Sequence, residues 1–194
     1  NSFNEVWEAD EIYVCSGADF ETLYPQLYAM LPLTKCKLQM MKMEAQDQRI
    51  GPALCGGLSL IHYQSFKAAP SLTALRQRYE SQYADYIRWG IHVMVSQHES
   101  GELTIGDSHE YGLNPEPFDK DLINSLILSY LKTFATFGKG KITENWHGIY
   151  PKLTDGSAYT ILTPEEGVTI INGFGGAGMT LSFGVCEKLI QDRT

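Results

Sequence analysis

The sequence lacks a long apolar run, an excess of positive charge and closely spaced cysteines. No hydrophobic stretch approaches the roughly 20 residues that a transmembrane helix requires, so neither a membrane span nor a signal peptide is expected. The formal net charge is −8, which argues against nucleic acid or an anionic membrane surface as a partner. The four cysteines form no C-x-x-C pair, and their wide spacing favours reduced thiols in the cytoplasm over disulfides or a zinc site.

Sequence patterns for metal binding and for nucleophilic catalysis are also missing. His92, His98 and His109, together with Asp107, could be drawn as a metal site on one hairpin. Their spacing fits no compact ligand pattern such as H-E-x-x-H, and it conflicts with the alternation of side chains along strands, so no metal is expected. There is no G-x-S-x-G turn and no cysteine has a histidine close by in the sequence, so a nucleophilic mechanism is not expected either.

The composition is that of an ordinary globular protein. The chain has 194 residues, of which 43% are hydrophobic and 20% are charged. This length can bury the core of one large domain or of two small ones. The chain begins at Asn1 rather than at a methionine, which indicates either a processed terminus or a piece of something longer.

The most distinctive segment is rich in glycine and lies near the end of the chain. Four glycines stand within residues 173–178, after the apolar, branched residues 168–171 that are typical of a strand. Leu181, Val185 and Leu189 then recur every four residues, as on the buried face of a helix. A strand, a glycine turn and a helix in this order aim backbone N–H groups and a positive dipole end at an electron-rich ligand. The spacing G-x-G-G-x-G closes the chain instead of opening a βαβ unit, so we do not interpret it as the dinucleotide fingerprint.

Strands and helices are intermixed along the rest of the chain. Strands are predicted at residues 11–15, 34–44, 58–63, 91–95, 102–105, 141–150, 157–162 and 168–171. Apolar spacings of three and four predict one helix over residues 72–86 and another from Asp119, as N-cap, to Gly138. Together these elements predict an α+β fold, with an antiparallel mixed sheet flanked by two long helices.

The patterns also predict how side chains are arranged on two of these elements. In the strand at residues 34–44, Cys36, Leu38 and Met40 are expected on one face. The residues expected to point inward from the second helix are Leu122, Leu126, Tyr130 and Phe134.

Four segments, in this order, resemble a known family. They are residues 11–19 (EIYVCSGAD), residues 92–110 with their ending IGDSHE, residues 146–156 (WHGIYPKLTDG) and residues 173–181 (GFGGAGMTL). The chain resembles the C-terminal part of the FAD-dependent oxidoreductases of the D-amino-acid oxidase, glycine oxidase and sarcosine oxidase superfamily. A bacterial branch associated with aminophosphonate breakdown is the subgroup that the Gly-Asp-Ser-His-Glu segment resembles.

The resemblance implies a division of the chain and a missing partner. Residues 1–33 would be a remnant of the FAD-binding domain, residues 34–150 the substrate-binding domain, and residues 151–194 a return segment with a flavin-contacting loop. Members of the family open with a nucleotide-binding unit, which nothing before Glu11 could supply. FAD is therefore expected in the full-length protein, whose missing N-terminal FAD-binding domain would be the partner of this chain. The chain alone is not expected to hold FAD tightly or to be active.

The resemblance also implies site residues. The implied catalytic residues are His92, His109 and Tyr150. The implied cofactor contacts are Ser16, Gly17, Gly175, Gly176, Ala177, Gly178, Met179 and Thr180. The implied substrate contacts are Met94, Trp146 and His147. Several have a purely structural alternative, namely a turn for the glycines and for Ser16, a turn cap for His109, and core packing for His92, Trp146 and His147.

One position departs from the family pattern. Members that oxidise amino acids carry an arginine before the proline at 151, where its forked guanidinium grips a carboxylate, but this chain has Tyr150. The implied reaction is hydride transfer to the flavin from a small amine of the amino-acid or aminophosphonate type. The alternative is a non-catalytic ligand-binding or assembly module derived from the same fold.

Overall fold

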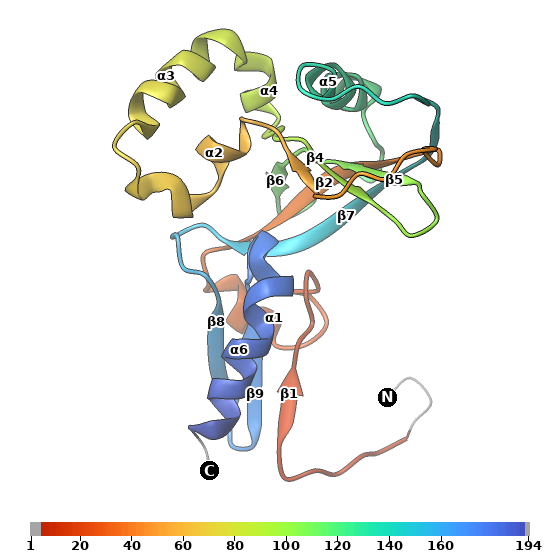
Figure 1. Ribbon diagram of the computed structural model, residues 1–194. Helices are drawn as coiled ribbons and strands as arrows, with labels where there is room; N and C mark the ends of the chain where they lie inside the picture. The colour runs from red at the N-terminus through yellow and green to blue at the C-terminus, as the bar shows by residue number, and fades with distance from the viewer. Residues whose placement is uncertain (1–4, 193–194) are drawn as a thin grey trace. The chain divides into compact units, whose positions relative to one another are not determined.

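The computed structural model describes residues 5–192 and divides the chain into two compact units. Unit 1 consists of Asn1–Cys36 and Tyr150–Thr194, and unit 2 consists of Lys37–Ile149. The chain therefore leaves unit 1 once, forms unit 2 and returns (Figure 1). No helix of the described chain is long and apolar enough to cross a membrane.

Unit 1 is built on a three-stranded sheet of order β1-β9-β8. Its strands are β1 (Ile12–Val14), β9 (Val168–Asn172) and β8 (Thr160–Glu165). β1 pairs with β9 in parallel, whereas β8 pairs with β9 in the antiparallel direction. All five residues of the central β9 are buried, as expected for a strand covered on both faces.

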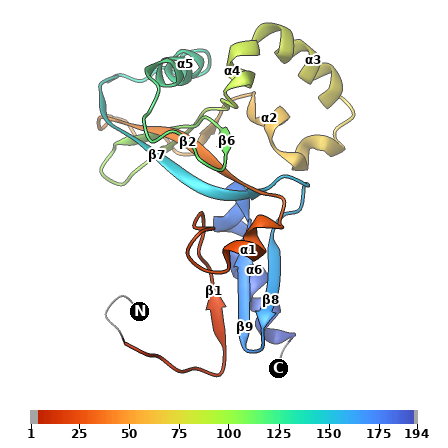
Figure 2. The same ribbon diagram turned by 180° about the vertical axis from the view of Figure 1, so that it is seen from behind.

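Two helices accompany this sheet, on opposite faces of it. They are α1 (Pro25–Ala29) and α6 (Gly178–Gln191), the latter preceded by the 3₁₀ turn η2 (Gly175–Ala177). α6 lies in front of the sheet in Figure 1 and behind it in Figure 2. The buried core of the unit consists of Val14, Phe20, Tyr28, Leu33, Leu153, Val168 and Ile170.

Unit 2 is built on a larger sheet whose path is β3-β4-β5-β2-β6, with β7 paired to β2. Its strands are β2 (Leu33–Met43), β3 (Leu54–Cys55), β4 (Met94–Gln97), β5 (Leu103–Gly106), β6 (Glu110–Gly112) and β7 (Ile142–Leu153). The helices are α2 (Ser59–His62), η1 (Gln64–Ala68), α3 (Leu72–Gln82), α4 (Ala84–Arg88) and α5 (Asp121–Leu131). β2 and β7 each have residues in both units.

The predicted fold class is confirmed, although the strands form two sheets instead of one. The fold is α+β with antiparallel sheet pairs and a C-terminal helix. The strand predicted at 34–44 is β2, displaced by one residue, and the strands predicted at 91–95 and 102–105 correspond to the antiparallel pair of β4 and β5, which turns at Gly101. Gly101 takes a φ of 92° at the turn, a conformation that glycine adopts without steric cost.

The strand predicted at residues 58–63 was wrong. This segment forms the short helix α2, whose N-cap Leu58 and helical residue Ile61 are both buried in the core at a spacing of three. The backbone N–H of Leu58 donates to the Tyr130 hydroxyl at 2.9 Å, which anchors the start of the turn. This tertiary contact from a distant helix could not be inferred from the local alternation of apolar residues.

The predicted start, end and inner face of the next helix also need correction. Asp119 does not cap α5, because its carboxylate is engaged by Lys37 at 3.1 Å and by His147 at 2.8 Å. The helix begins at Asp121 and ends at Leu131, well before Gly138. Its buried residues are Ile123, Ile127, Tyr130 and Leu131, whereas Leu122 is exposed. Tyr130 is buried and Leu126 is half-buried against the same core, as predicted, whereas Leu122 and Phe134 are exposed. Apolar residues occupy most positions of this helix, so the sequence alone did not single out the buried face.

Three further elements differ from what the apolar spacing alone suggests. On β2 the buried set includes Lys37 and Gln39, whereas Leu38 and Met40 are only half-buried. The helix predicted over 72–86 breaks at Tyr83, which divides it into α3 and α4. α6 contains no buried residue, although its predicted inner positions Val185 and Leu189 are half-buried.

Candidate functional site

The glycine segment forms a tight turn between β9 and α6 in unit 1. Gly173 and Gly175 have φ values of 80° and 59°, which side chains other than glycine rarely tolerate. A Cβ on Gly173 would stand 3.0 Å from the side chain of Leu153, so space as well as conformation requires glycine there. Gly178, in contrast, is helical, with a φ of −53° at the start of α6.

The turn at Ser16 and Gly17 lies at the same edge of the sheet. It follows β1, which runs parallel to the neighbouring β9, so the two turns leave adjacent carboxyl ends. Ligands of sheets with parallel strands bind at such carboxyl ends. The side chain of Asn172 links the turns, because its Nδ2 donates to the carbonyl of Gly17 at 3.0 Å.

Tyr150 and Lys152 come from β7 and flank the glycine turn. A Cβ on Gly176 would lie 3.6 Å from the Tyr150 hydroxyl oxygen, and Lys152 forms an antiparallel bridge with Phe174. The start of α6 has neither a side-chain cap nor an acidic residue in its first turn, and Gly176 is exposed. Backbone N–H groups at such a helix start are therefore directed at whatever occupies the space before them.

A second group of predicted residues meets inside unit 2. His92 and His109 are 2% and 6% exposed, and they stack with their ring centroids 4.9 Å apart. His62, from α2, completes a cluster: its ring centroid lies 4.0 Å from that of His92 and 4.4 Å from that of His109. We call His62, His92 and His109 the histidine cluster.

The sequence did not reveal His62 as a member. The reason is the wrong strand at 58–63, which hid the turn that carries this side chain into the cluster. His98, which the sequence placed on the same hairpin as His92 and His109, lies outside the cluster, and its Nε2 meets the Thr104 hydroxyl at 2.6 Å.

Fixed polar partners surround the histidine cluster. The Nδ1 of His109 lies 2.9 Å from the carbonyl of Gly90, so this nitrogen carries the proton and donates it. The Nε2 of His92 lies 3.3 Å from Oδ1 of Asp107. Burial raises the pKa of the Asp107 carboxyl to about 7, and burial also raises the pKa of nearby Tyr63, with a further contribution from Asp107.

The predicted substrate contacts are placed differently. Met94 is partly exposed on β4, with the hydroxyl of Tyr63 at 3.7 Å from its sulfur. Trp146 is partly exposed on β7, and its neighbour His147 is held by Asp119. The predicted residues thus fall into two groups, one at the carboxyl edge of the unit 1 sheet and one in unit 2.

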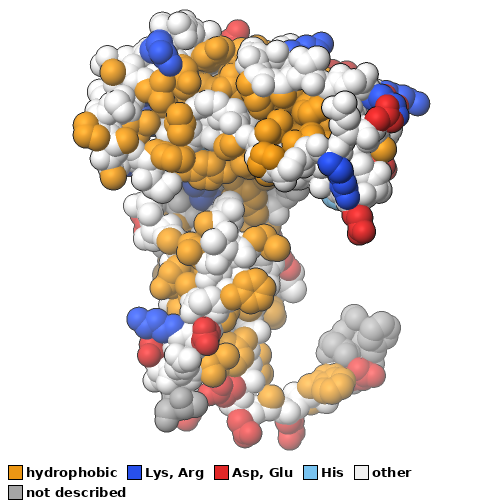
Figure 3. Space-filling model, in the orientation of Figure 1, with side chains coloured by type: hydrophobic (Ala, Val, Ile, Leu, Met, Phe, Trp, Pro, Cys, Tyr) orange, Lys and Arg blue, Asp and Glu red, His pale blue; other side chains and the backbone are white. Residues whose placement is uncertain are grey.

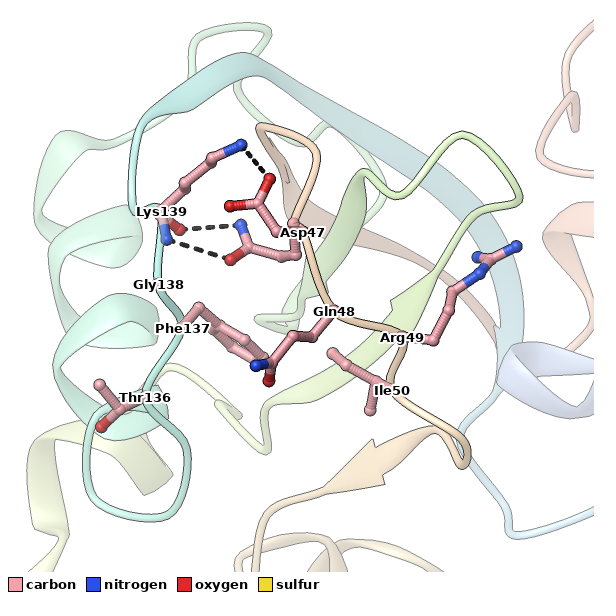
Figure 4. A pocket seen from close by; sticks show the side chains of 9 residues that line it. Asp47, Gln48, Arg49, Ile50, Thr136, Phe137, Gly138 and Lys139 are labelled. Carbon is pink, nitrogen blue, oxygen red and sulfur yellow. Dashed lines mark hydrogen bonds and ion pairs between the residues drawn. The ribbon is translucent and has the colours of Figure 1, made fainter.

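A surface cavity of about 310 Å³ lies in unit 2. It opens between residues 46–50 and residues 136–139, which are tied together by two hydrogen bonds between the Gln46 side chain and the Lys139 backbone. Asp47 pairs with Lys139 at 2.6 Å, while Arg49 points away from this pair (Figure 4). None of the predicted site residues lines the cavity, and we assign it no function.

Comparison with known proteins identifies the family. Residues 4–191 match the family described as "FAD dependent oxidoreductase". The chain belongs to this family of FAD-dependent oxidoreductases. The resemblance drawn from the four sequence segments is thereby confirmed.

Solved structures of the family share the fold. Glycine oxidase from Geobacillus kaustophilus superposes with a TM-score of 0.60 at 15% identity, over 91% of this chain and 39% of that chain. Glycine oxidase from Bacillus cereus ATCC 14579 superposes with a TM-score of 0.57 at 12% identity, over 89% of this chain and 39% of that chain. L-proline dehydrogenase from P. horikoshii superposes with a TM-score of 0.58 at 16% identity, over 90% of this chain and 40% of that chain. A search of curated proteins gives no significant match. The chain therefore spans about two-fifths of these relatives, and at such identities the likeness concerns the fold.

The residues of unit 1 fit the cofactor that the family uses. The exposed Gly176 and Ala177 leave backbone accessible, and the uncapped start of α6 offers N–H groups and a positive dipole end. Both features suit the electron-rich edge of a flavin ring.

Proposed function

We propose that this chain is the substrate-binding part of a cytoplasmic FAD-dependent oxidoreductase that oxidises a small amine of the amino-acid or aminophosphonate type. The observation that carries the proposal is the pair of turns at the carboxyl ends of β1 and β9, in a chain that belongs to this family. Asn172 ties these two turns together.

The residues that would hold the flavin are those of the two turns. Ser16 and Gly17 lie after β1, while Gly175, Gly176 and Ala177 form η2. Gly178, Met179 and Thr180 begin α6, whose N-terminal N–H groups stabilise negative charge. When bound, the cofactor supplies the chemistry of accepting a hydride from the carbon that bears the amine.

The residues beside the glycine turn would orient the substrate. The Tyr150 hydroxyl donates a hydrogen bond to an anionic head group but cannot neutralise its charge, unlike an arginine. Lys152, two residues further along β7, adds a positive charge next to the same turn. The combination of Tyr150 and Lys152 therefore favours a substrate whose anionic head group is not the carboxylate that an arginine binds in relatives.

Met94 and Trp146 of unit 2 are partly exposed and stay predicted substrate contacts, whereas His147 is engaged by Asp119. His92 and His109 are buried against each other, so we assign them a positioning role and not direct contact with the substrate.

The partner of this chain would be the domain that binds the rest of FAD. α6 has no buried residue and exposes Met179, at 87%, together with Phe183 and Ile190. Apolar side chains are visible along this helix in Figure 3. An amphipathic helix with an uncovered apolar side is typical of a surface that another domain covers.

The test is a comparison of substrates for the full-length enzyme. We expect kcat/KM for 2-aminoethylphosphonate or its N-methyl form to exceed kcat/KM for glycine, sarcosine and D-alanine. The loss of an arginine–carboxylate pair costs roughly a hundredfold or more in rate. Efficient turnover of glycine or D-alanine would contradict the proposed head group, and absence of turnover with every amine would contradict the proposed reaction.

A further inference from the structure

The histidine cluster brings three potential metal ligands to one place. His62, His92 and His109 each offer one ring nitrogen, and these three atoms lie within 4.8 Å of one another. The residues come from three separate segments, namely α2, the approach to β4 and the approach to β6. Their proximity is therefore a product of the fold of unit 2 and not of a local sequence pattern.

The groups around the cluster are those that fix metal-bound histidines. A ligating imidazole usually donates its other N–H to a carbonyl or a carboxylate, which sets its tautomer and orientation. The Nδ1 of His109 donates to the Gly90 carbonyl at 2.9 Å, so Nε2 is its ligand atom. The carboxylate of Asp107 stands 3.3 Å from a ring nitrogen of His92 and supplies a compensating negative charge.

We propose that His62, His92 and His109 bind one divalent transition-metal ion, with zinc as the best fit. Three imidazoles suit Zn²⁺ and its neighbours in the first transition row, whereas Mg²⁺ and Ca²⁺ prefer oxygen ligands. Three histidines with one further position, for water or for the Asp107 carboxylate, form a common tetrahedral arrangement of zinc.

The geometry requires only a modest closure. Zn–N bonds of about 2.0–2.1 Å place tetrahedral ligand atoms roughly 3.3 Å apart, so the ring nitrogens must approach by up to about 1.5 Å. His62 is the member able to move, since it is only half-buried and lies on a helix of four residues. Its partial exposure also provides the path by which an ion enters.

The site is distinct from the flavin contacts of the proposed function. It belongs to unit 2, and the glycine turns belong to unit 1. Metal binding would tie α2 to the segments that lead into β4 and β6, and so would stabilise unit 2 whether or not the flavin reaction is assigned correctly.

Zinc binding to the full-length protein tests the proposal. The purified protein is stripped with a chelator, dialysed and titrated with Zn²⁺ in competition with a chromophoric chelator, and bound metal is counted by mass spectrometry. We expect one tightly bound zinc per chain, and zinc K-edge absorption that reports three imidazole nitrogens. Zinc should also raise the unfolding temperature of the metal-free protein.

Matched variants assign the ligands. His62→Ala should weaken zinc binding at least a hundredfold, as expected for loss of one of three ligands, and His62→Gln tests the same loss with less change of volume. His98→Ala is the control, because His98 lies outside the cluster beside Thr104, and this variant should bind zinc as tightly as the unchanged protein. Asp107→Asn should weaken binding by roughly 10- to 100-fold, as loss of a carboxylate partner of a metal-bound histidine does.

The readout is independent of amine oxidation. Zinc affinity that is the same in His62→Ala, His62→Gln and the unchanged protein would overturn the proposal. A folded full-length protein that contains no zinc after purification and binds none on titration would overturn it as well. Flavin content and flavin reduction are measured on the same samples, so failure of the metal site and failure of the proposed reaction are distinguished.

Discussion

The side-chain amide of Asn172 donates a hydrogen bond of 3.0 Å to the backbone carbonyl of Gly17, a residue 155 positions earlier in the chain. The same Nδ2 lies 3.0 Å from the hydroxyl of Tyr28, which in turn lies 3.0 Å from Oγ of Ser16. One buried asparagine therefore holds together the two turns that we assign to the flavin. The contact explains why a strand near the start and a strand near the end of the chain must fold together.

Replacement of Asn172 should loosen both turns. Asn172→Ala leaves the Gly17 carbonyl and the Tyr28 hydroxyl without this donor, at a cost of roughly 1–3 kcal/mol in the free energy of unfolding. Asn145→Ala, at an exposed position of β7, should change that free energy by less than about 0.5 kcal/mol. Chemical denaturation of the two variants measures the difference, and equal stabilities would show that the Asn172 contacts contribute nothing.

Two glycines at the end of the chain should respond in opposite directions to the same substitution. Gly175→Ala places a side chain at a φ of 59° and should destabilise the protein by roughly 1–2 kcal/mol. Gly184→Ala lies within α6, where a Cβ meets no atom within 4 Å, and should stabilise the helix by up to about 1 kcal/mol. Thermal unfolding of the two variants shows whether each substitution lowers or raises the stability of the protein. A Gly175→Ala protein as stable as Gly184→Ala would mean that the turn does not need its left-handed conformation.

The buried lysine of β2 should be essential for stability. Lys37 is 1% exposed, and its Nζ bonds to the carbonyls of Glu116 and Phe118 and to the carboxylate of Asp119. Lys37→Met removes the cation from this buried set and should cost roughly 3–5 kcal/mol. Lys42→Met, which removes a more exposed pair with Glu144, should cost at most about 1 kcal/mol. A similar decrease in the free energy of unfolding for both variants would show that the buried contacts of Lys37 contribute no more than an exposed ion pair.

The contrast between Lys37 and Leu38 shows where sequence reasoning about the fold succeeds and where it ends. Alternation along β2 was enough to predict the strand, because side chains of a strand alternate between faces. It did not show that the opposite face is the more buried one, since Lys37 and Gln39 are buried by finding polar partners 79 and 81 residues away. Such partners depend on tertiary structure, and hydrophobicity alone places a lysine outside.

The candidate site was predictable to a different extent. The glycine turn between β9 and α6 was evident, because four glycines in six residues after a strand are typical of a tight turn. His92 and His109 were singled out as separate residues. Their association with His62 could not be foreseen, since it depends on α2 and on contacts between three segments that the sequence does not order in space.

Tyr150 should control the preference for the head group of the substrate. Tyr150→Arg restores the forked cation that amino-acid oxidising relatives carry, so kcat/KM for glycine or sarcosine should rise by roughly a hundredfold in the full-length enzyme. Tyr150→Phe adds no charge and serves as the control, for which no such gain is expected. Steady-state kinetics decide, and an arginine variant without a gain on carboxylate substrates would show that position 150 does not face the head group.

Anaerobic reduction of the flavin by an amine shows whether the full-length protein is an amine oxidoreductase. The full-length protein should purify with FAD, and mixing it with the preferred small amine in the absence of oxygen should bleach the flavin absorbance and yield the corresponding carbonyl compound. A full-length protein that binds no flavin, or whose bound flavin stays oxidised with aminophosphonates and amino acids alike, would contradict the proposed reaction.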